Sequence, residues 1–530
     1  MFAIAAAVMC LAVIAARLTG PSDLHDQTQE KTSAYTTDIV LHAGDWERWV
    51  LPMQQGMHPA TKPPLYNWLA APAVWISEGR AEWPHRLPSV AAFVGVCGLL
   101  WMLGRRIDPS GLTAPLAVII LSSNYAWFKL AGLIRPDTLL SLWLALGWAG
   151  VTIILSGAAS APQRRFWRAV IWLACALAVL TKGPPALLIP AFAAVLAWID
   201  GGGRGRWRRA WQGLRECGTI WGLPLVLGIT AIWLALVWTI DADHLYHTMI
   251  REEFIDRALG TGEEGVKEGP WDLIRTALNM PFYFISRYLP WSLFFFGALY
   301  DLRASRVGAG TVDPAIAPAS QPPSPKSQAR FWMVSGVIFT VLVVLAFTLV
   351  AGKRADYIAS AYIPASFVVA WCLGHLGWKL ARHRPAALLT LAAITLISLV
   401  VHDRTNGYAA KYPLSESLWA FAREVRPLIE AEALPLEFYR TGAAPLQTML
   451  HRSQPVVRTP DDLVERIGRH EAAWVIVSDR VAAEVLAEAQ KARWGMELRA
   501  TSRAAQGSEA AEPLEMRLYR VTTARRAPPK

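Results

Sequence analysis

Long apolar runs separated by short polar segments fill most of the 530-residue chain. Many approach the roughly 20 residues that a helix needs to cross a bilayer, so they predict membrane-spanning helices. Gly183 and two prolines interrupt residues 169–199, which therefore form either two helices or one broken hairpin. We count about eleven spans, near residues 2–16, 87–104, 112–128, 138–156, 169–181, 183–199, 218–240, 281–300, 331–351, 357–378 and 385–401.

The end of the chain has a different pattern. Residues 415–432 have the periodicity of an amphipathic helix, and residues 436–439, 474–477 and 514–519 are strand-like. Residues 402–530 therefore predict a small α/β domain, in which we recognise no catalytic set. Such a domain is better suited to binding or covering a site than to catalysis.

The distribution of charge separates these two parts. Residues 402–530 hold 36 of the 93 charged residues in 129 positions, about 28%, whereas residues 1–401 hold 57, about 14%. An ordinary soluble chain has roughly 25% charged residues, so residues 1–401 cannot form a solvated globule. The fold class predicted is a mainly α polytopic membrane protein, residues 1–401, with a small C-terminal α/β domain, residues 402–530.

The net charge of +11 would suit a nucleic-acid partner, but the basic residues lie between apolar runs, where they set membrane orientation instead. With a cytoplasmic N-terminus, the loops on the cytoplasmic side carry 17 Lys/Arg and only 5 Asp/Glu. An odd number of spans then places the C-terminal domain outside, in the periplasm of a bacterial inner-membrane protein. Residues 302–330, rich in Pro, Ala, Gly and Ser, predict a flexible cytoplasmic linker.

Polar residues collect in the segments that this orientation places outside. The first is the loop of residues 18–86, which is too long for a simple connection and is therefore expected to fold. Shorter outer segments lie at the ends of later spans. The candidate site residues in these segments are Asp26, Lys62, Tyr66, Arg135, Asp137, Lys182, Glu253, Arg257, Lys353 and Tyr357.

Each candidate also has a simpler interpretation. Asp26 suits a solvated loop carboxylate, Lys62 an interfacial lysine, Asp137 a helix cap and Lys182 a helix end, while residues 251–257 suit a surface helix with ion pairs. Their common location favours a site for an anionic lipid headgroup. Lys and Arg side chains bind phosphate, and a carboxylate accepts a proton or binds a metal ion.

Several short motifs follow one another in an order that resembles a known family. They are Gly44-Asp45-Trp46, Lys62-Pro63-Pro64-Leu65-Tyr66-Asn67-Trp68, Arg86-Leu87-Pro88-Ser89, Arg135-Pro136-Asp137, Thr181-Lys182-Gly183, Glu253 with Arg257, Pro290-Trp291-Ser292, and Lys353 with Tyr357. The chain over roughly residues 1–375 resembles the bacterial GT-C glycosyltransferases, specifically the lipid A aminoarabinose transferase and related dolichyl-phosphate-mannose protein mannosyltransferases.

This resemblance implies a periplasmic transfer of sugar from an undecaprenyl-phosphate-linked donor to lipid A, another envelope glycan or a protein. It also implies a first-loop Asp and Asp137 at the reaction centre near a divalent metal ion, with Lys62, Arg257 and Lys353 at the donor phosphate. The family reads Asp-Glu about fifteen residues before the Gly-Asp-Trp element, where this chain has Thr28-Gln29. Asp26 is the nearest carboxylate and Asp23 the next.

Two other function classes remain open at this point. A transporter or flippase for a lipid-linked sugar would place charges within its spans and is often built from repeats, and we find no internal repeat here. A non-catalytic envelope scaffold would explain the altered first-loop motif. The clustering of charged residues at one interface favours the transferase.

Overall fold

The computed structural model describes residues 1–22, 24, 26–201, 205–256, 270–308, 325–350, 354–375, 379–406, 414–441, 444–502 and 515–523. The chain divides into two compact units. The helical unit comprises Met1–Leu18, Thr61–Tyr66 and Pro88–Val400. The sheet-containing unit comprises Thr19–Ala60, Asn67–Leu87 and Val401–Lys530.

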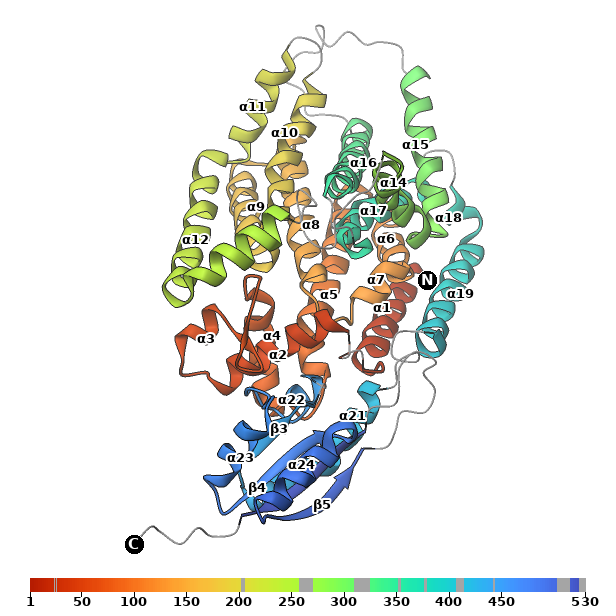
Figure 1. The fold of residues 1–530 in the computed structure, drawn as a ribbon. Coiled ribbons are helices and arrows are strands. Elements are labelled where there is room, and N and C mark those ends of the chain that lie inside the picture. Colours follow the sequence, from red (N-terminus) through yellow and green to blue (C-terminus); the bar gives the residue numbers. More distant parts are fainter. Residues whose placement is uncertain are drawn as a thin grey trace. The chain divides into compact units, whose positions relative to one another are not determined.

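Helices make up almost all of the helical unit (Figure 1). Its elements, two of which begin or end just inside the other unit, are α1 (Phe2–Leu18), α5 (Trp83–Ile107), α6 (Thr113–Ser122), α7 (Tyr125–Leu130), α8 (Pro136–Leu155), α9 (Ala161–Lys182), η1 (Pro184–Leu187), α10 (Leu188–Asp200), α11 (Arg206–Glu216), α12 (Thr219–Ile240), η3 (His244–Asp256), α14 (Pro270–Arg287), α15 (Trp291–Gly308), α16 (Pro325–Leu349), η4 (Ala355–Ala361), α17 (Tyr362–Gly374), α18 (Leu380–His383) and α19 (Pro385–Asn406).

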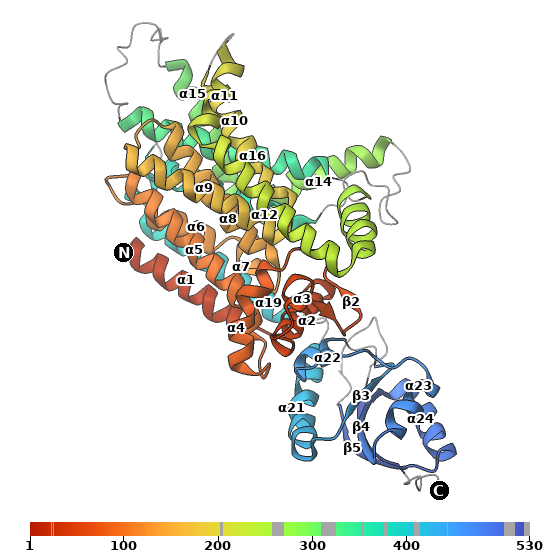
Figure 2. The same cartoon turned by 90° about the vertical axis from the view of Figure 1, so that its left-hand side faces the viewer.

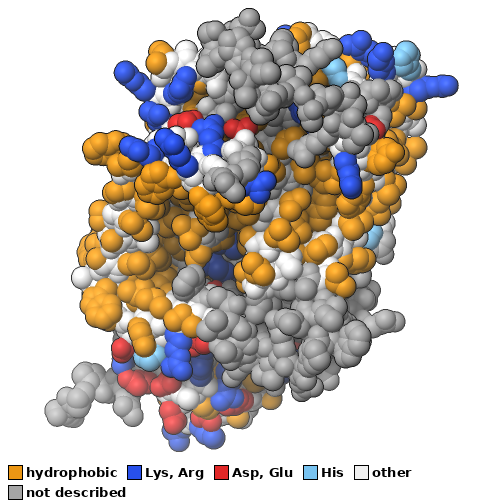
Figure 3. Space-filling model, turned by 90° about the horizontal axis from the view of Figure 1, so that it is seen from above, with side chains coloured by type: hydrophobic (Ala, Val, Ile, Leu, Met, Phe, Trp, Pro, Cys, Tyr) orange, Lys and Arg blue, Asp and Glu red, His pale blue; other side chains and the backbone are white. Residues whose placement is uncertain are grey.

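Six helical segments in the described part of the chain are long and apolar enough to cross a membrane, and three shorter apolar helices accompany them. The polytopic fold class predicted from the sequence is therefore confirmed. In Thr219–Ile240 and Pro385–Thr405 only 22% and 17% of the apolar window is buried, as expected of helices that face lipid. Hydrophobic side chains cover a broad part of the face drawn in Figure 3.

The stretch 169–199 forms two helices, α9 and α10, as the first of the two alternatives predicted. The helix α9 ends at Lys182 because Gly183 adopts a φ of +77°, which a residue with a side chain rarely adopts. The prolines that follow begin the short 3-10 helix η1, which leads into α10. Lys182 is thus held at a defined helix end.

The predicted linker 302–330 is helical at both ends. The helix α15 continues to Gly308 and α16 begins at Pro325, so only residues 309–324 lie outside the described part of this segment. Pro at the first position of a helix is favourable because its missing N–H has no partner there. The boundaries predicted from composition were therefore too wide.

The sheet-containing unit is built from the first loop and the C-terminal residues. Its four-stranded sheet has the order β3-β4-β6-β5, with β3 and β4 parallel and the other pairs antiparallel. Figure 2 shows β3, β4 and β5 with α23 and α24 beside them. Helices α23 and α24 pack against one face of this sheet, while α21 contacts β5 and β6. The elements are α2 (Gln27–Leu41), α3 (Trp46–Val50), β1 (Met53–Gln54), β2 (His58–Pro59), α4 (Leu65–Ser77), α21 (Leu414–Glu432), β3 (Leu436–Tyr439), α22 (Ala444–Met449), α23 (Pro460–Gly468), β4 (Ala472–Ser478), α24 (Asp479–Lys491), β5 (Gly495–Thr501) and β6 (Met516–Thr522).

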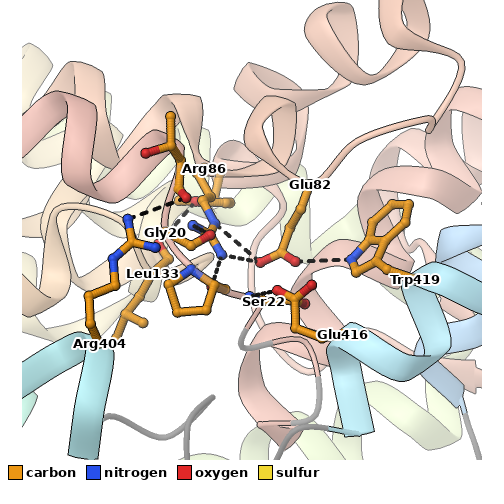
Figure 4. A network of polar contacts seen from close by, with 11 residues as sticks. Gly20, Ser22, Glu82, Arg86, Leu133, Arg404, Glu416 and Trp419 are labelled. Carbon is orange, nitrogen blue, oxygen red and sulfur yellow. Dashed lines mark hydrogen bonds and ion pairs between the residues drawn. The ribbon is translucent and has the colours of Figure 1, made fainter. Parts of the chain in front are cut away.

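A buried polar network joins the first loop to the C-terminal residues (Figure 4). Arg86, which is 1% exposed, pairs with Glu82 at 2.5 Å, and Glu82 accepts a hydrogen bond from the Trp419 indole at 3.2 Å. The backbone N–H of Ser22 donates to Glu416 at 2.8 Å. The division at residue 401 predicted from charge density thus separates segments that belong to one compact unit, in which Glu82 and Ser22 of the first loop bond to Trp419 and Glu416.

Asp38 is a second link between the same two segments. Its carboxylate is fully buried, and it accepts hydrogen bonds from the Met53 backbone N–H at 2.8 Å and from the Ser453 hydroxyl at 2.7 Å. A buried carboxylate is costly unless such donors surround it. Asp38 therefore anchors α2 to the turn that follows α22.

Candidate functional site

Asp137 and Lys182 meet because α8 and α9 form a helical hairpin. Asp137 lies in the first turn of α8 and Lys182 is the last residue of α9, so both come to the same end of the pair. The Trp143 indole donates to the Thr181 hydroxyl at 3.1 Å and ties the two helices there. The Lys182 ammonium pairs with the Asp137 carboxylate and lies 4.2 Å from the centre of the Tyr357 ring.

A second group of charges lies on the elements around this pair. Arg135, directly before α8, donates to Asp356 at 2.9 Å. Arg287, the last residue of α14, donates to the other oxygen of Asp356 at 3.2 Å. Asp356 belongs to η4, which packs against α8, α14 and α16. One carboxylate thus holds two guanidinium groups from different helices.

These charges form one cluster with an excess of cations. Lys62 and Arg135 both act electrostatically on Asp137. The two carboxylates of the set are buried, with Asp137 7% and Asp356 9% exposed. Four cations and two carboxylates leave an excess of two positive charges, which favours binding of an anion. We call this set the ionic cluster: Lys62, Arg135, Asp137, Lys182, Arg287 and Asp356.

Two members of the ionic cluster, Asp356 and Arg287, were not among the residues predicted from the sequence. Asp356 lies between Lys353 and Tyr357, which were both selected, but we did not select it. Arg287 is three residues before the Pro290-Trp291-Ser292 motif and inside an apolar run, where an arginine is unusual. An arginine inside an apolar run was therefore the feature of the sequence that could have identified Arg287.

Tyr66 has a supporting position in this structure. Its hydroxyl lies 3.1 Å from the hydroxyl of Ser89, and Ser89 donates to the carbonyl of Leu133 at 2.6 Å. The side chain of Tyr66 is 2% exposed. Tyr66 and Ser89 therefore hold the turn that leads into Arg135, which links the Lys-Pro-Pro and Arg-Leu-Pro-Ser motifs to the ionic cluster.

Of the remaining predicted site residues, the structure describes Glu253 and Asp26. Glu253 is part of the π-helix η3, which contacts α12. Arg257, Lys353 and the runner-up Asp23 lie outside the described residues. Asp26 belongs to the sheet-containing unit, where one of its carboxylate oxygens caps α2 by accepting from the backbone N–H groups of Thr28 and Gln29.

Glu30 is an acid in the first loop that sequence reasoning did not select. It lies one helical turn after Asp26, and its carboxylate accepts a hydrogen bond from the Gln54 amide at 2.6 Å. Burial raises the pKa of Glu30 to about 7; the charge of Asp26 acts in the same direction, while Gln54 and Lys31 oppose it. The signal in the sequence was its place four residues after Asp26, in the first turn of the helix that Asp26 caps.

The divalent metal ion implied by the family resemblance does not fit the residues around Asp137. Among the described residues, His, Cys, Asp and Glu form no group of three or more that could hold a metal ion. The partner of Asp137 is the Lys182 ammonium, and Arg135 and Lys62 add further positive charge. Such surroundings repel a cation.

Parts of the chain are similar in sequence to known proteins. Residues 61–228 match the family model described as dolichyl-phosphate-mannose-protein mannosyltransferase. The chain is 27% identical over 224 residues, 42% of its length, to the undecaprenyl phosphate-alpha-4-amino-4-deoxy-L-arabinose arabinosyl transferase of Edwardsiella ictaluri. It is 24% identical over 379 residues, 70% of its length, to the protein of the same name from Pseudomonas aeruginosa. The matched parts span 37% and 61% of these relatives.

The fold is similar over the whole chain. The crystal structure of ArnT from Cupriavidus metallidurans bound to undecaprenyl phosphate has a TM-score of 0.68 at 17% sequence identity, covering 100% of this chain and 98% of that one. The apo structure of the same protein has a TM-score of 0.64. The resemblance to the GT-C glycosyltransferases of the aminoarabinose transferase type is therefore confirmed, by a family model over part of the chain and by the fold over all of it.

Proposed function

We propose that this protein is an integral membrane glycosyltransferase. It takes a sugar from an undecaprenyl-phosphate-linked donor and transfers it to lipid A, another envelope glycan or a protein. Supporting this proposal, relatives matched over part of the chain carry the name of an undecaprenyl phosphate-aminoarabinose arabinosyl transferase, and a structure with the same fold is described as bound to undecaprenyl phosphate.

The observation that carries the proposal is the excess of two positive charges in the ionic cluster. A polyprenyl phosphate sugar is a phosphodiester with one negative charge, and the polyprenyl phosphate that leaves is a monoester with a second ionisable oxygen. Arg135 and Arg287, held by one carboxylate, suit bidentate binding of phosphate oxygens. Lys182 supplies a compact charge beside them.

In the proposed step, the bond between the anomeric carbon and the donor phosphate oxygen breaks while the acceptor oxygen bonds to that carbon. Negative charge grows on the phosphate as the bond breaks, and preorganised cations stabilise that charge more than they stabilise the intact donor. Asp137 keeps the Lys182 ammonium in place. No metal ion takes part in the step as we propose it.

The chemical class of the acceptor determines whether the reaction needs a general base. A hydroxyl acceptor loses a proton as its oxygen attacks, whereas a phosphate acceptor is already ionised. We propose that a first-loop carboxylate, Asp26 or Glu30, accepts this proton. The environment of Glu30 favours it over Asp26, because a pKa of about 7 is close to the working pH and Asp26 caps a helix.

A direct assay tests the proposed function. The purified full-length protein is incubated with an undecaprenyl-phosphate-linked aminosugar and, in separate reactions, with lipid A, envelope glycans or envelope proteins, and the products are analysed by mass spectrometry. We expect one of these acceptors to gain the mass of one sugar residue and undecaprenyl phosphate to be released in equal amount. Transfer to none of the three, with an intact donor, would contradict the proposal.

A cellular comparison identifies the natural acceptor. Lipids and envelope glycans from a deletion strain and its parent are compared by mass spectrometry. We expect one envelope species to lose a sugar in the deletion strain while the lipid-linked donor accumulates. Accumulation of the donor on the cytoplasmic leaflet alone would instead indicate a flippase.

A further inference from the structure

A surface on α9 and α11 is rich in both arginine and exposed tryptophan. On α11, Trp207 is 80% exposed and Trp211 is 60% exposed, and their four-residue spacing places them on one side of the helix. Ala210 and Gly213 are the buried residues of α11. The tryptophans therefore lie beside the face with which α11 packs.

Arginines occupy the neighbouring side of α11. Arg208 and Arg215 are exposed and, at seven residues apart, lie on the same side, about 10 Å from each other along the axis. Arg209 is different, because it pairs with Asp200 at 3.4 Å and with Glu216 at 2.8 Å. The helix thus presents tryptophan and arginine stripes next to each other, the pattern of an interfacial helix.

The start of α9 adds to this surface. Arg168 of α9 donates to the carbonyl of Glu216 at 2.7 Å, and Trp172 donates to the carbonyl of Cys217 at 2.9 Å. These bonds join α9 to the junction of α11 and α12 directly after the first turns of α9. Arg164 and Arg165, in those first turns, are exposed. We call Arg164, Arg165, Trp207, Arg208, Trp211 and Arg215 the basic–aromatic surface.

The exposed tryptophans of α12 indicate the depth of this surface in the membrane. Trp221 and Trp238 of α12 are 84% and 59% exposed, and most side chains between them are exposed and apolar. Seventeen residues of α-helix span about 26 Å, close to the hydrocarbon thickness of a bilayer. Exposed tryptophans mark the two membrane interfaces. Trp221, five residues after the end of α11, therefore places the basic–aromatic surface at headgroup level.

We propose that the basic–aromatic surface binds the headgroup of an anionic phospholipid. The observations favour a lipid over a soluble anion, because exposed tryptophans beside the arginines would contact acyl chains and glycerol while the guanidinium groups contact phosphate. Charge complementarity sets the class of lipid: the described residues of 160–168 and 200–217 hold seven arginines against Asp200 and Glu216, a net charge of +5. This surface lies on the side that the charge bias assigns to the cytoplasm.

The test compares two variants of the full-length protein with the same change of charge. R164Q/R165Q/R208Q/R215Q removes four arginines of the surface. R469Q/R480Q/R493Q/R499Q removes four exposed arginines of the sheet-containing unit and is the control. Each protein is mixed with phosphatidylglycerol or phosphatidylcholine in detergent, and bound lipids are counted by native mass spectrometry. A thermal melt with each lipid, and with inorganic phosphate at equal concentration, follows.

We expect the parent and the control to retain phosphatidylglycerol at least fivefold more than phosphatidylcholine, with a higher melting temperature in phosphatidylglycerol only. The surface variant should lose both effects. Equal retention by all three proteins would overturn the proposal, as would an equal stabilisation of the parent by inorganic phosphate. If the fourfold variant is not produced, R208Q/R215Q against R493Q/R499Q gives the same comparison. Sugar transfer does not enter this test.

Discussion

The ammonium group of Lys182 pairs with the carboxylate of Asp137, although 45 residues separate them in the sequence. Both groups are largely buried, with side-chain exposures of 13% and 9%. Removing either charge takes away the ion-pair partner of the other in a largely buried site, which is more costly than losing an exposed pair. This relationship governs how substitutions at either position should act.

The first prediction is that Asp137→Asn abolishes transfer while the protein still reaches the membrane. The substitution conserves shape but releases Lys182 from its position beside the leaving phosphate. Removal of one preorganised electrostatic interaction costs on the order of a hundredfold or more in turnover. The control is Asp200→Asn, which breaks a pair with Arg209 whose acid is 46% exposed and should leave turnover unchanged. Near-normal turnover of Asp137→Asn would make this acid a structural residue of α8.

The second prediction concerns Asp356, which holds Arg135 and Arg287. Asp356→Asn removes one negative charge from the ionic cluster and loosens both guanidinium groups. We expect turnover to fall about 10- to 100-fold, in the range typical of lost positioning, while undecaprenyl phosphate inhibits more strongly because the cluster is more positive. Asp356→Glu should partly restore turnover. Weaker inhibition by undecaprenyl phosphate in Asp356→Asn would argue against phosphate binding by this cluster.

Sequence reasoning found the part of the site that follows from topology. The bias of Lys/Arg between loops predicted Asp137, Lys182 and Tyr357 on one side of the membrane, and in the structure the hairpin of α8 and α9 brings the first two together beside Tyr357. The pairs of Asp356 with Arg135 and Arg287 join residues 221 and 69 positions apart, and no local pattern encodes such a pairing.

The fold, like the site, was predicted where the sequence has a local pattern and was missed where it has none. Strands β3, β4 and β6 were predicted because they have apolar patterns in the sequence. The strand β5 was missed because it is a mostly exposed edge strand that carries Glu497 and Arg499, charges that favour solubility of an edge but hide its pattern. The packing of the first loop with the C-terminal residues depends on buried polar pairs such as Ser453 with Asp38, which hydrophobic periodicity does not report.

The third prediction concerns the orientation in the membrane. Reporter fusions after Cys217, at the end of α11, and after Arg404, near the end of α19, should report opposite compartments, the cytoplasm and the periplasm respectively. The physical reason is the excess of arginine on the α11 side. A fusion within the loop between α5 and α6, after Ser110, serves as an internal control and should match the fusion after Cys217. The same compartment at Cys217 and Arg404 would contradict this orientation.

The fourth prediction is a pH dependence of stability from Glu30. Burial raises its pKa from an ordinary value of 4.5 to about 7, so the folded protein binds a proton that the unfolded chain has released between these values. This contribution to stability is fully present below about pH 4.5 and is lost as the pH rises through about 7. The pKa difference corresponds to at most about 3 kcal/mol, and solvent screening reduces the expected effect to about 1–2 kcal/mol.

Glu30→Gln tests this linkage because glutamine stays neutral and can still accept from Gln54. We expect the variant to be more thermally stable than the parent at pH 8 and similar to it at pH 4.5. Melting temperatures measured from pH 4.5 to 8.5 give the comparison. Glu47→Gln, at an acid of α3 that is not buried, is the control and should follow the parent at every pH. Parallel curves for the parent and Glu30→Gln would contradict the prediction.

The final prediction separates the two first-loop acids in catalysis. Asp26→Asn keeps an oxygen that can cap α2 but removes the charge, and Glu30→Gln likewise keeps the contact with Gln54 and removes the charge. If Glu30 accepts the proton of a hydroxyl acceptor, Glu30→Gln should lower turnover by roughly a hundred- to ten-thousandfold with little change in donor binding. The rise of activity with pH through about 7 should disappear in the same variant, because the ionised base is the active form. Asp26→Asn should retain that rise.

Steady-state kinetics of both variants between pH 5.5 and 8.5, with a purified lipid-linked donor, show which of the two acids is the base. An inactive Asp26→Asn beside a fully active Glu30→Gln would assign the role to Asp26, and small losses in both would indicate a phosphate acceptor, which needs no base.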